Sequence, residues 1–154
     1  MSDHHAGVRW KRTSADFTYA SYNRAHEMVF KGGNITLDAS ATPAYKGDAD
    51  RVDPEEAFVA SLSSCHMLTF LAICALKKIT VETYDDAAVG FMEKGANGKM
   101  QITRVILHPV VQFADGANVT PEMLADFHHQ AHDGCFIANS VTTDVTVAQR
   151  DSQN

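Results

Sequence analysis

The side chains that could take the most different chemical roles in this chain are its three cysteines, Cys65, Cys74 and Cys135. An odd number of cysteines fits poorly with the paired framework of a small secreted protein. Where disulfides do not persist, a cysteine is a buried apolar side chain, a metal ligand or a reactive thiol. We therefore ask which of these three descriptions fits each cysteine.

Cys65 and Cys74 share a segment, residues 57–76, that contains no glycine, proline or formal charge. On a helix they lie roughly 180° apart, so they cannot belong to one site. Cys74, between Ile73 and Ala75, is predicted to be a small buried hydrophobe. For Cys65 two interpretations stay open, a buried apolar side chain and a reactive thiol. Its neighbourhood is unusually polar for such a helix and contains Ser61, Ser63, Ser64, His66 and Thr69.

The stretch His128–Cys135 is the second concentration of reactive side chains. His128 and His132 are one helical turn apart, and Cys135 falls near the same stripe, so one interpretation is a zinc site. The alternative is that these histidines are solvated near the end of a helix, where the dipole favours them. The spacing matches no established zinc motif. No serine has the G-x-S-x-G context of a hydrolase.

The elements that position these groups begin with Asp53-Pro54-Glu55-Glu56, a dense helix start in which Asp53 can cap and Glu56 can complete a capping box. The pattern predicts a helix over Pro54 to Lys77, roughly 36 Å long. Because it is apolar nearly all round, we expect it to form the buried centre of the protein.

The rest of the chain predicts strands, a second helix and a loop. We expect a flexible segment at residues 1–7, and one α+β domain over 1–154 with a mainly antiparallel sheet wrapped around the long helix. The predicted strands are Val8–Arg12, His26–Lys31, Asn34–Ser40, Thr80–Met92, Gln101–Phe113 and Val141–Val147; the second helix runs from Thr120 to about Asp133, and the loop is Pro43–Arg51.

Composition narrows the classes of partner. The net charge of −6 argues against a nucleic-acid binder and against a polybasic membrane contact. We find no run of roughly 18 apolar residues that would span a membrane, and no apolar signal segment. We expect a cytoplasmic protein with no nucleic-acid or membrane partner and no bound cofactor or metal.

The segment Asp53–His66 closely resembles the first signature of the OsmC/Ohr family, the osmotically inducible and organic hydroperoxide resistance proteins. The segment Ala131–Val141 is similar to the second signature. The order of elements also fits, so the resemblance covers nearly the whole chain from Val8. One departure is Phe136, where hydroperoxide-resistance members usually have proline.

The resemblance implies a thiol-dependent peroxidase that reduces organic hydroperoxides to alcohols. Cys65 matches the peroxidatic cysteine, which becomes a sulfenate, and Cys135 matches the resolving cysteine, which forms a disulfide with it. An external dithiol of lipoyl or thioredoxin type would reopen that bond. Glu55 matches the family's acid. Arg24 is the loosest match, for the arginine that would stabilise the thiolate, and Arg9, Arg12 and Arg51 stay open as alternatives to it. On a straight helix Glu55 and Cys65 are roughly 15 Å apart along the axis, so Glu55 cannot act on Cys65 directly.

The family also implies an intertwined homodimer with active sites at the subunit interface. The long helix supports this separately, because one subunit offers too little chain to cover an apolar helix on every side. Two other functions remain as alternatives: a small-molecule or lipid binding protein of the same fold without peroxidase activity, and a zinc-binding protein.

Overall fold

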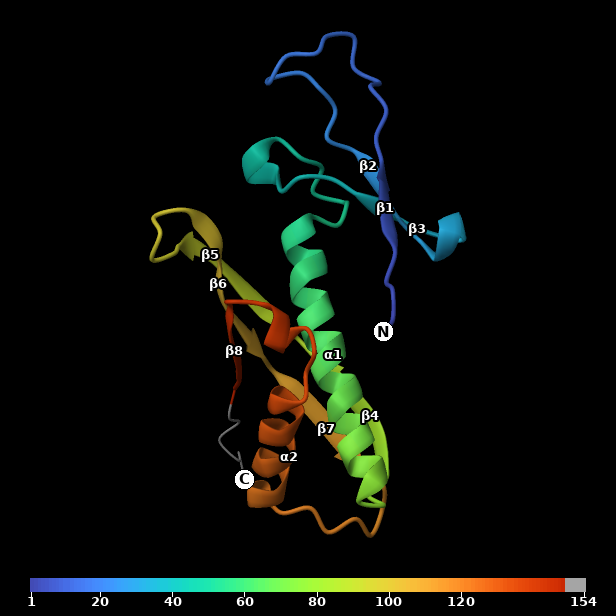
Figure 1. Cartoon of the computed structure of the whole chain (residues 1–154), viewed down its shortest axis with the longest axis vertical. Helices are drawn as coiled ribbons and strands as arrows, with labels where there is room; N and C mark the ends of the chain where they lie inside the picture. Colours follow the sequence, from blue (N-terminus) through green and yellow to red (C-terminus); the bar gives the residue numbers. More distant parts are fainter. Residues whose placement is uncertain (149–154) are drawn as a thin grey trace. The chain divides into compact units, whose positions relative to one another are not determined.

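The computed structural model describes residues 1–148, and the chain divides into two compact units. The first unit is Met1–Ala57, and the second begins at Phe58. The helix α1 (Pro54–Leu76) starts in the first unit and continues in the second. Figure 1 shows the elements along the chain.

The first unit is built on a three-stranded antiparallel sheet in the order β1-β2-β3. Its strands are β1 (Ala6–Arg9), β2 (His26–Phe30) and β3 (Ile35–Ala39). The predicted hairpin turn between β2 and β3 is present, and both of its glycines, Gly32 and Gly33, have positive φ angles of 66° and 103°. Strand β1 begins at Ala6, within the segment that we expected to be flexible.

The start of α1 is the predicted capping box. The backbone N–H of Glu56 donates to Asp53 Oδ1 at 2.8 Å, and the N–H of Asp53 donates to Glu56 Oε2 at 3.1 Å. Two N–H groups that a helix start leaves unpaired are therefore satisfied reciprocally. The predicted first residue of the helix is confirmed.

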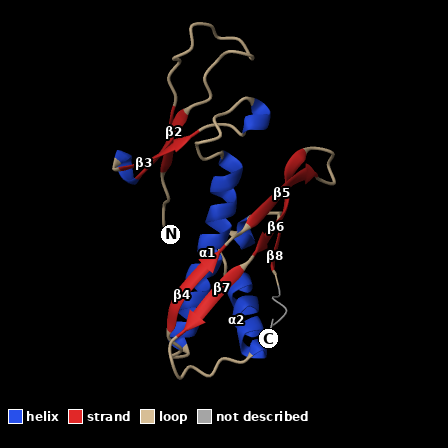
Figure 2. Ribbon diagram, turned by 180° about the vertical axis from the view of Figure 1, so that it is seen from behind, coloured by secondary structure: helices blue, strands red, loops and turns tan. Residues whose placement is uncertain are grey.

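The second unit contains two sheets (Figure 2). The two long strands predicted at Thr80–Met92 and Gln101–Phe113 are wrong, because each is broken into two strands that belong to different sheets. One sheet pairs β4 (Val81–Asp86) with β7 (Pro109–Phe113), and the other has β5 (Val89–Lys94), β6 (Met100–Leu107) and β8 (Asp144–Val147). All pairs are antiparallel except β6 with β8, which is parallel.

The breaks between β4 and β5 and between β6 and β7 occur close to Asp86, whose carboxylate accepts two hydrogen bonds. Asp86 Oδ1 accepts a hydrogen bond from the backbone N–H of His108 at 2.6 Å, and Oδ2 accepts one from Ser63 Oγ on α1 at 2.5 Å. Pro109, opposite Asp86 in the pairing of β4 with β7, has no N–H to continue the ladder. At this point a hydrogen bond to a side chain therefore replaces a backbone hydrogen bond of the ladder.

The second helix, α2 (Pro121–Asp133), has the ends that its sequence predicts. Thr120 Oγ1 accepts from the N–H of Met123 at 3.2 Å, and Gly134 follows the last turn as its cap. This helix packs on α1 through a cluster of buried apolar side chains: Phe70, Cys74, Phe127 and Ala131. Cys74 is 1% exposed, which confirms that it is a small buried hydrophobe.

The described residues of the second unit bury one side of α1. Leu62, His66, Phe70 and Cys74 are buried at regular helical spacing. The opposite stripe is exposed, so the expectation of burial all round does not hold within the described part of this unit. The exposed stripe consists of Ala60, Ser64, Leu68, Ala72 and Leu76.

By length and composition α1 could cross a membrane, with a mean hydropathy of 1.8. This finding qualifies our reading that no apolar run is long enough. A single helix of this kind is weak evidence for a membrane span, since the core helix of a soluble protein passes the same test.

A pair of buried histidines also joins α1 to α2. His66 Nε2 and His128 Nδ1 are hydrogen-bonded at 3.0 Å, and the rings are stacked at a centroid distance of 5.4 Å. The expectation that the histidines of α2 are solvated is thus wrong for His128, which is 9% exposed. Burial, followed by the nearby His128 and His132, lowers the pKa of His66 from 6.5 to about 4, and burial lowers the pKa of His128 to about 4.

We predict that acid weakens the fold through this pair. Between pH 6.5 and about 4 the unfolded chain binds protons that the folded His66 and His128 do not, so the stability present above pH 6.5 is lost as the pH falls. Each histidine should contribute a slope of about 1.4 kcal/mol per pH unit in the free energy of unfolding.

Urea unfolding across this pH range measures the slope. His128→Gln should make it shallower, whereas the control His129→Gln, at an exposed position on the same helix, should leave it unchanged. An identical slope in His128→Gln and the parent protein would contradict the assignment.

Candidate active site

Cys65 and Cys135 come together from different elements of the second unit. Cys65 lies in the middle of α1 and is half-buried, whereas Cys135 follows the end of α2 and is 1% exposed. Cys65 is near enough to Cys135 to contribute to the raised pKa of its thiol, and both cysteines are free. The fold therefore brings the two cysteines into one neighbourhood of the second unit.

Gly134 allows this approach. A Cβ atom added there would lie 3.0 Å from Thr69 Cγ2 on α1 and 3.4 Å from the carbonyl oxygen of Gln130, closer than most real Cβ contacts. Thr69 is one turn beyond Cys65, and its hydroxyl donates to the Cys65 carbonyl at 2.9 Å. A side chain at position 134 would push the chain at Cys135 away from the turn that carries Cys65.

The Cys135 thiol is held in its protonated form. Burial, followed by the hydrogen bond with Cys65, raises the pKa of Cys135. The backbone N–H groups of Ala138 and Ile137 act in the other direction, and Ala138 donates to Cys135 Sγ at 3.4 Å. Since burial is the largest cause, the balance favours S–H over S⁻.

The other two predicted site residues lie in the first unit, so their proximity to Cys65 stays a prediction. Arg24 is 8% exposed, donates to the carbonyl oxygens of Tyr22 and Tyr19 at 2.5 Å each, and lies over the Tyr22 ring at 3.8 Å. Glu55 lies in the first turn of α1 and is half-buried.

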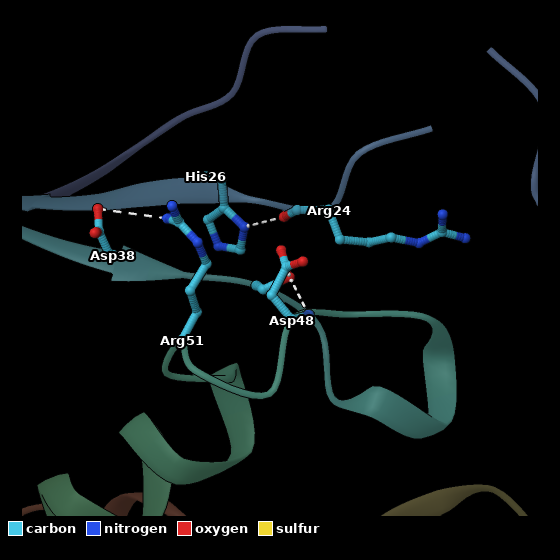
Figure 3. Close-up of polar contacts among 6 residues, drawn as sticks. Arg24, His26, Asp38, Asp48 and Arg51 are labelled. Carbon is cyan, nitrogen blue, oxygen red and sulfur yellow. Dashed lines mark hydrogen bonds and ion pairs between the residues drawn. The ribbon is translucent and has the colours of Figure 1, made fainter. Parts of the chain in front are cut away.

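Other arginines of the first unit compete less well for a role in a site. Arg51 pairs with Asp38 at 3.4 Å, as Figure 3 shows, and Arg12 donates to the carbonyl oxygens of Ser14 and Ala15. Both have partners on the surface of the first unit. Arg24 is more buried than either, at 8% exposed, and its role stays a prediction.

Sequence reasoning missed two polar partnerships beside Cys65. They are the bond from Ser63 to Asp86 and the pair of His66 with His128. His66 Nδ1 is buried and has no hydrogen-bond partner among residues 1–148. The available signal was the run of polar residues in an apolar helix, but their partners lie 23 and 62 positions along the chain.

The zinc alternative finds no ligand set in the part of the chain that the structure describes. Within residues 1–148, no three side chains of His, Cys, Asp or Glu are grouped so that they could hold a metal ion. Of the histidines on α2, His128 is paired with His66, and His129 lies 3.5 Å from Asp133 on the surface. Cys135 is paired with Cys65 instead of a histidine.

Known structures resemble the chain over nearly its full length. An OsmC-like protein of unknown function from Vibrio cholerae is 47% identical over 96% of this chain and 99% of its own, with a TM-score of 0.89. An organic hydroperoxide resistance protein from Elizabethkingia anophelis covers 97% of this chain and 99% of its own at 19% identity and a TM-score of 0.68. OhrB of Bacillus subtilis, also an organic hydroperoxide resistance protein, covers 95% and 98% at 16% identity and 0.63.

The last two identities are low, so they support the fold alone, and they confirm the α+β class with mainly antiparallel sheets. No curated protein sequence matches the chain. The model of the family described as OsmC-like protein matches residues 47–150, which include both cysteines of the pair. This chain therefore belongs to the OsmC-like protein family.

Proposed function

We propose that the protein is a thiol-dependent peroxidase that reduces organic hydroperoxides to alcohols in the response to oxidative stress. The observation that carries the proposal is the proximity of Cys65 to Cys135, which contributes to the raised pKa of the Cys135 thiol. Family membership supports a redox role, and structural relatives of this chain carry the name of organic hydroperoxide resistance proteins.

In the proposed reaction the Cys65 thiolate attacks the terminal oxygen of the hydroperoxide. An S–O bond forms, the O–O bond breaks, and the alkoxide takes a proton and leaves as the alcohol. Cys65 is then a sulfenic acid. The Cys135 sulfur attacks it, the S–S bond forms, and hydroxide leaves with the Cys135 proton as water. An external dithiol of lipoyl or thioredoxin type reduces the disulfide by exchange.

The exposure of the two thiols supports the proposed roles. The attacking species must be a thiolate that the peroxide can reach, and Cys65 is the half-buried member of the pair. Cys135 is enclosed, and its pKa is raised by burial. Cys135 therefore suits the resolving role.

The reaction needs Cys65 as a thiolate, and a fixed cation beside a thiol favours that form. We propose Arg24 for this role, and Glu55 as a carboxylate that would orient its guanidinium during the reaction, since no ion pair joins the two in residues 1–148. Arginine suits the task because it keeps its charge at all working pH values.

The proposed substrate is an organic hydroperoxide with an apolar body. Phe136, directly after Cys135, is 81% exposed, and the neighbouring Ile137 is 36% exposed. Partly buried Phe58 precedes Cys65 on α1. These side chains offer contact to a hydrocarbon body that hydrogen peroxide lacks. We propose a cytoplasmic location for this chemistry.

We also propose that the working protein is a homodimer. The exposed stripe of α1 has leucines that are 60% exposed at Leu68 and 84% exposed at Leu76, separated by small residues. A contiguous apolar surface of this kind is typical of a protein interface. A second copy could cover it by a two-fold contact that pairs the same stripe with itself.

Serine substitutions test the thiol roles. Cys65→Ser should abolish consumption of cumene hydroperoxide in the presence of a dithiol. Cys135→Ser should complete about one equivalent and then stop, because the sulfenate has no partner. Cys74→Ser is the matched control and should keep activity near that of the parent, with some loss of stability from a buried hydroxyl.

Two outcomes would contradict the proposal. Inactivation by Cys74→Ser alone would show that the thiols are wrongly paired. Absence of turnover with dihydrolipoamide, thioredoxin and dithiothreitol alike would favour the alternative of a binding protein with this fold.

Light scattering on a dilution series tests the dimer. The parent protein should have twice the chain mass at low micromolar concentration, and Leu68→Glu should shift it to one chain mass by placing a charge in the stripe. Met100→Glu, at a position that is 52% exposed on β6, is the control and should leave the mass unchanged. A parent protein that is monomeric and active would overturn the proposal.

A further inference from the structure

A buried positive charge in the first unit lacks a negative partner. The guanidinium of Arg24 has no carboxylate within ion-pair distance among residues 1–148, although the side chain is 8% exposed. Two carbonyl oxygens and the rings of Tyr22 and Tyr19 compensate it in part. Arginine has more N–H donors than these carbonyls use, and Arg24 Nε is buried without a partner. Burying an unpaired charge is costly unless something else completes its environment.

The carboxylates near Arg24 in the sheet and its loop are already engaged. Asp48 accepts from the hydroxyl of Ser40 at 3.0 Å, and its N–H donates to the same oxygen at 3.1 Å. Asp38 pairs with Arg51 at 3.4 Å. Figure 3 shows Asp38 paired with Arg51, and it shows the Arg24 side chain extending away from Asp38 and Asp48. Neither of these two carboxylates therefore neutralises Arg24.

Arg24 lines an open cavity of about 430 Å³ that lies within the first unit. Its walls are mainly aromatic and apolar, with Trp10, Phe17 and Tyr22 beside the arginine and His26 as a further polar group. The three aromatic rings are packed in sequence, with centroid distances of 5.9 Å from Trp10 to Phe17 and 5.5 Å from Phe17 to Tyr22. A cavity of this size, with apolar walls and a few polar groups, is typical of small-molecule sites.

We propose that this cavity binds a small organic anion, a carboxylate with an apolar body. The carboxylate would pair with the guanidinium of Arg24, whose planar fork suits it. The hydrocarbon body would lie against Trp10, Phe17 and Tyr22. The site shares Arg24 with the proposed peroxidase machinery, but its binding of a carboxylate is a separate property, because neither a thiol nor a peroxide takes part.

Trp10 gives a direct readout, because it is the only tryptophan in the chain and it lines the cavity. Its indole N–H donates to the carbonyl oxygen of Asn23 at 2.7 Å, so its position is defined. Titration of the full-length Cys65→Ser protein with octanoate should change its fluorescence saturably. Octanamide, the neutral analogue of the same length, should bind at least tenfold more weakly. Use of the Cys65→Ser protein keeps this result independent of whether the protein reduces peroxides.

Arginine variants locate the anion. Arg24→Gln should weaken octanoate binding at least tenfold and leave octanamide binding nearly unchanged. Arg104→Gln is the matched control, because Arg104 also lies over an aromatic ring, that of Phe91 at 3.6 Å, but belongs to the second unit. It should bind octanoate as the parent does.

Three results would overturn the proposal: no saturable change with octanoate up to millimolar concentration, equal affinity for octanoate and octanamide, or unchanged octanoate affinity in folded Arg24→Gln. If circular dichroism shows that Arg24→Gln does not fold, the comparison of octanoate with octanamide in the Cys65→Ser protein decides alone.

Discussion

The proximity of Cys65 to Cys135 depends on how α1 and α2 pack. Phe70 meets Phe127 edge to face at 6.4 Å, and Ala131 is fully buried beside them. Gly134 then lets the chain turn close to α1 directly before Cys135. Without this close approach the two thiols would belong to separate surfaces. The rest of the second unit serves as the support that fixes these two helices against its sheets.

The polar middle of α1 is explained by the same packing. Ser63 bonds to Asp86, His66 to His128, and the Thr69 hydroxyl to the Cys65 carbonyl. Each of these groups satisfies a buried polar atom or anchors the helix to another element, so the helix gains a defined register at a low desolvation cost. Cys65 lies between these anchors. Its polar neighbours therefore serve to position the helix that carries it.

Residues close together in the sequence predicted much of this structure. Features that depend on contacts between distant residues were not predicted. The capping box at Asp53, the ends of α2 and the burial of Cys74 follow from residues close together in the chain, and all three are confirmed. The corner at Asp86 and the burial of His128 depend on partners far along the chain, which no periodicity contains. Strand lengths and the state of the histidines were predicted wrongly for that reason. The pairing of Cys65 with Cys135 came from family resemblance, and the roles of Arg24 and Glu55 remain predictions.

The most direct test of the central claim is the mass of the protein after one equivalent of cumene hydroperoxide, without added reductant. We predict the loss of two hydrogen atoms per chain, and digestion under non-reducing conditions should give one linked peptide pair that contains Cys65 and Cys135. Recovery of both cysteines as free thiols, or a link that involves Cys74, would contradict the account.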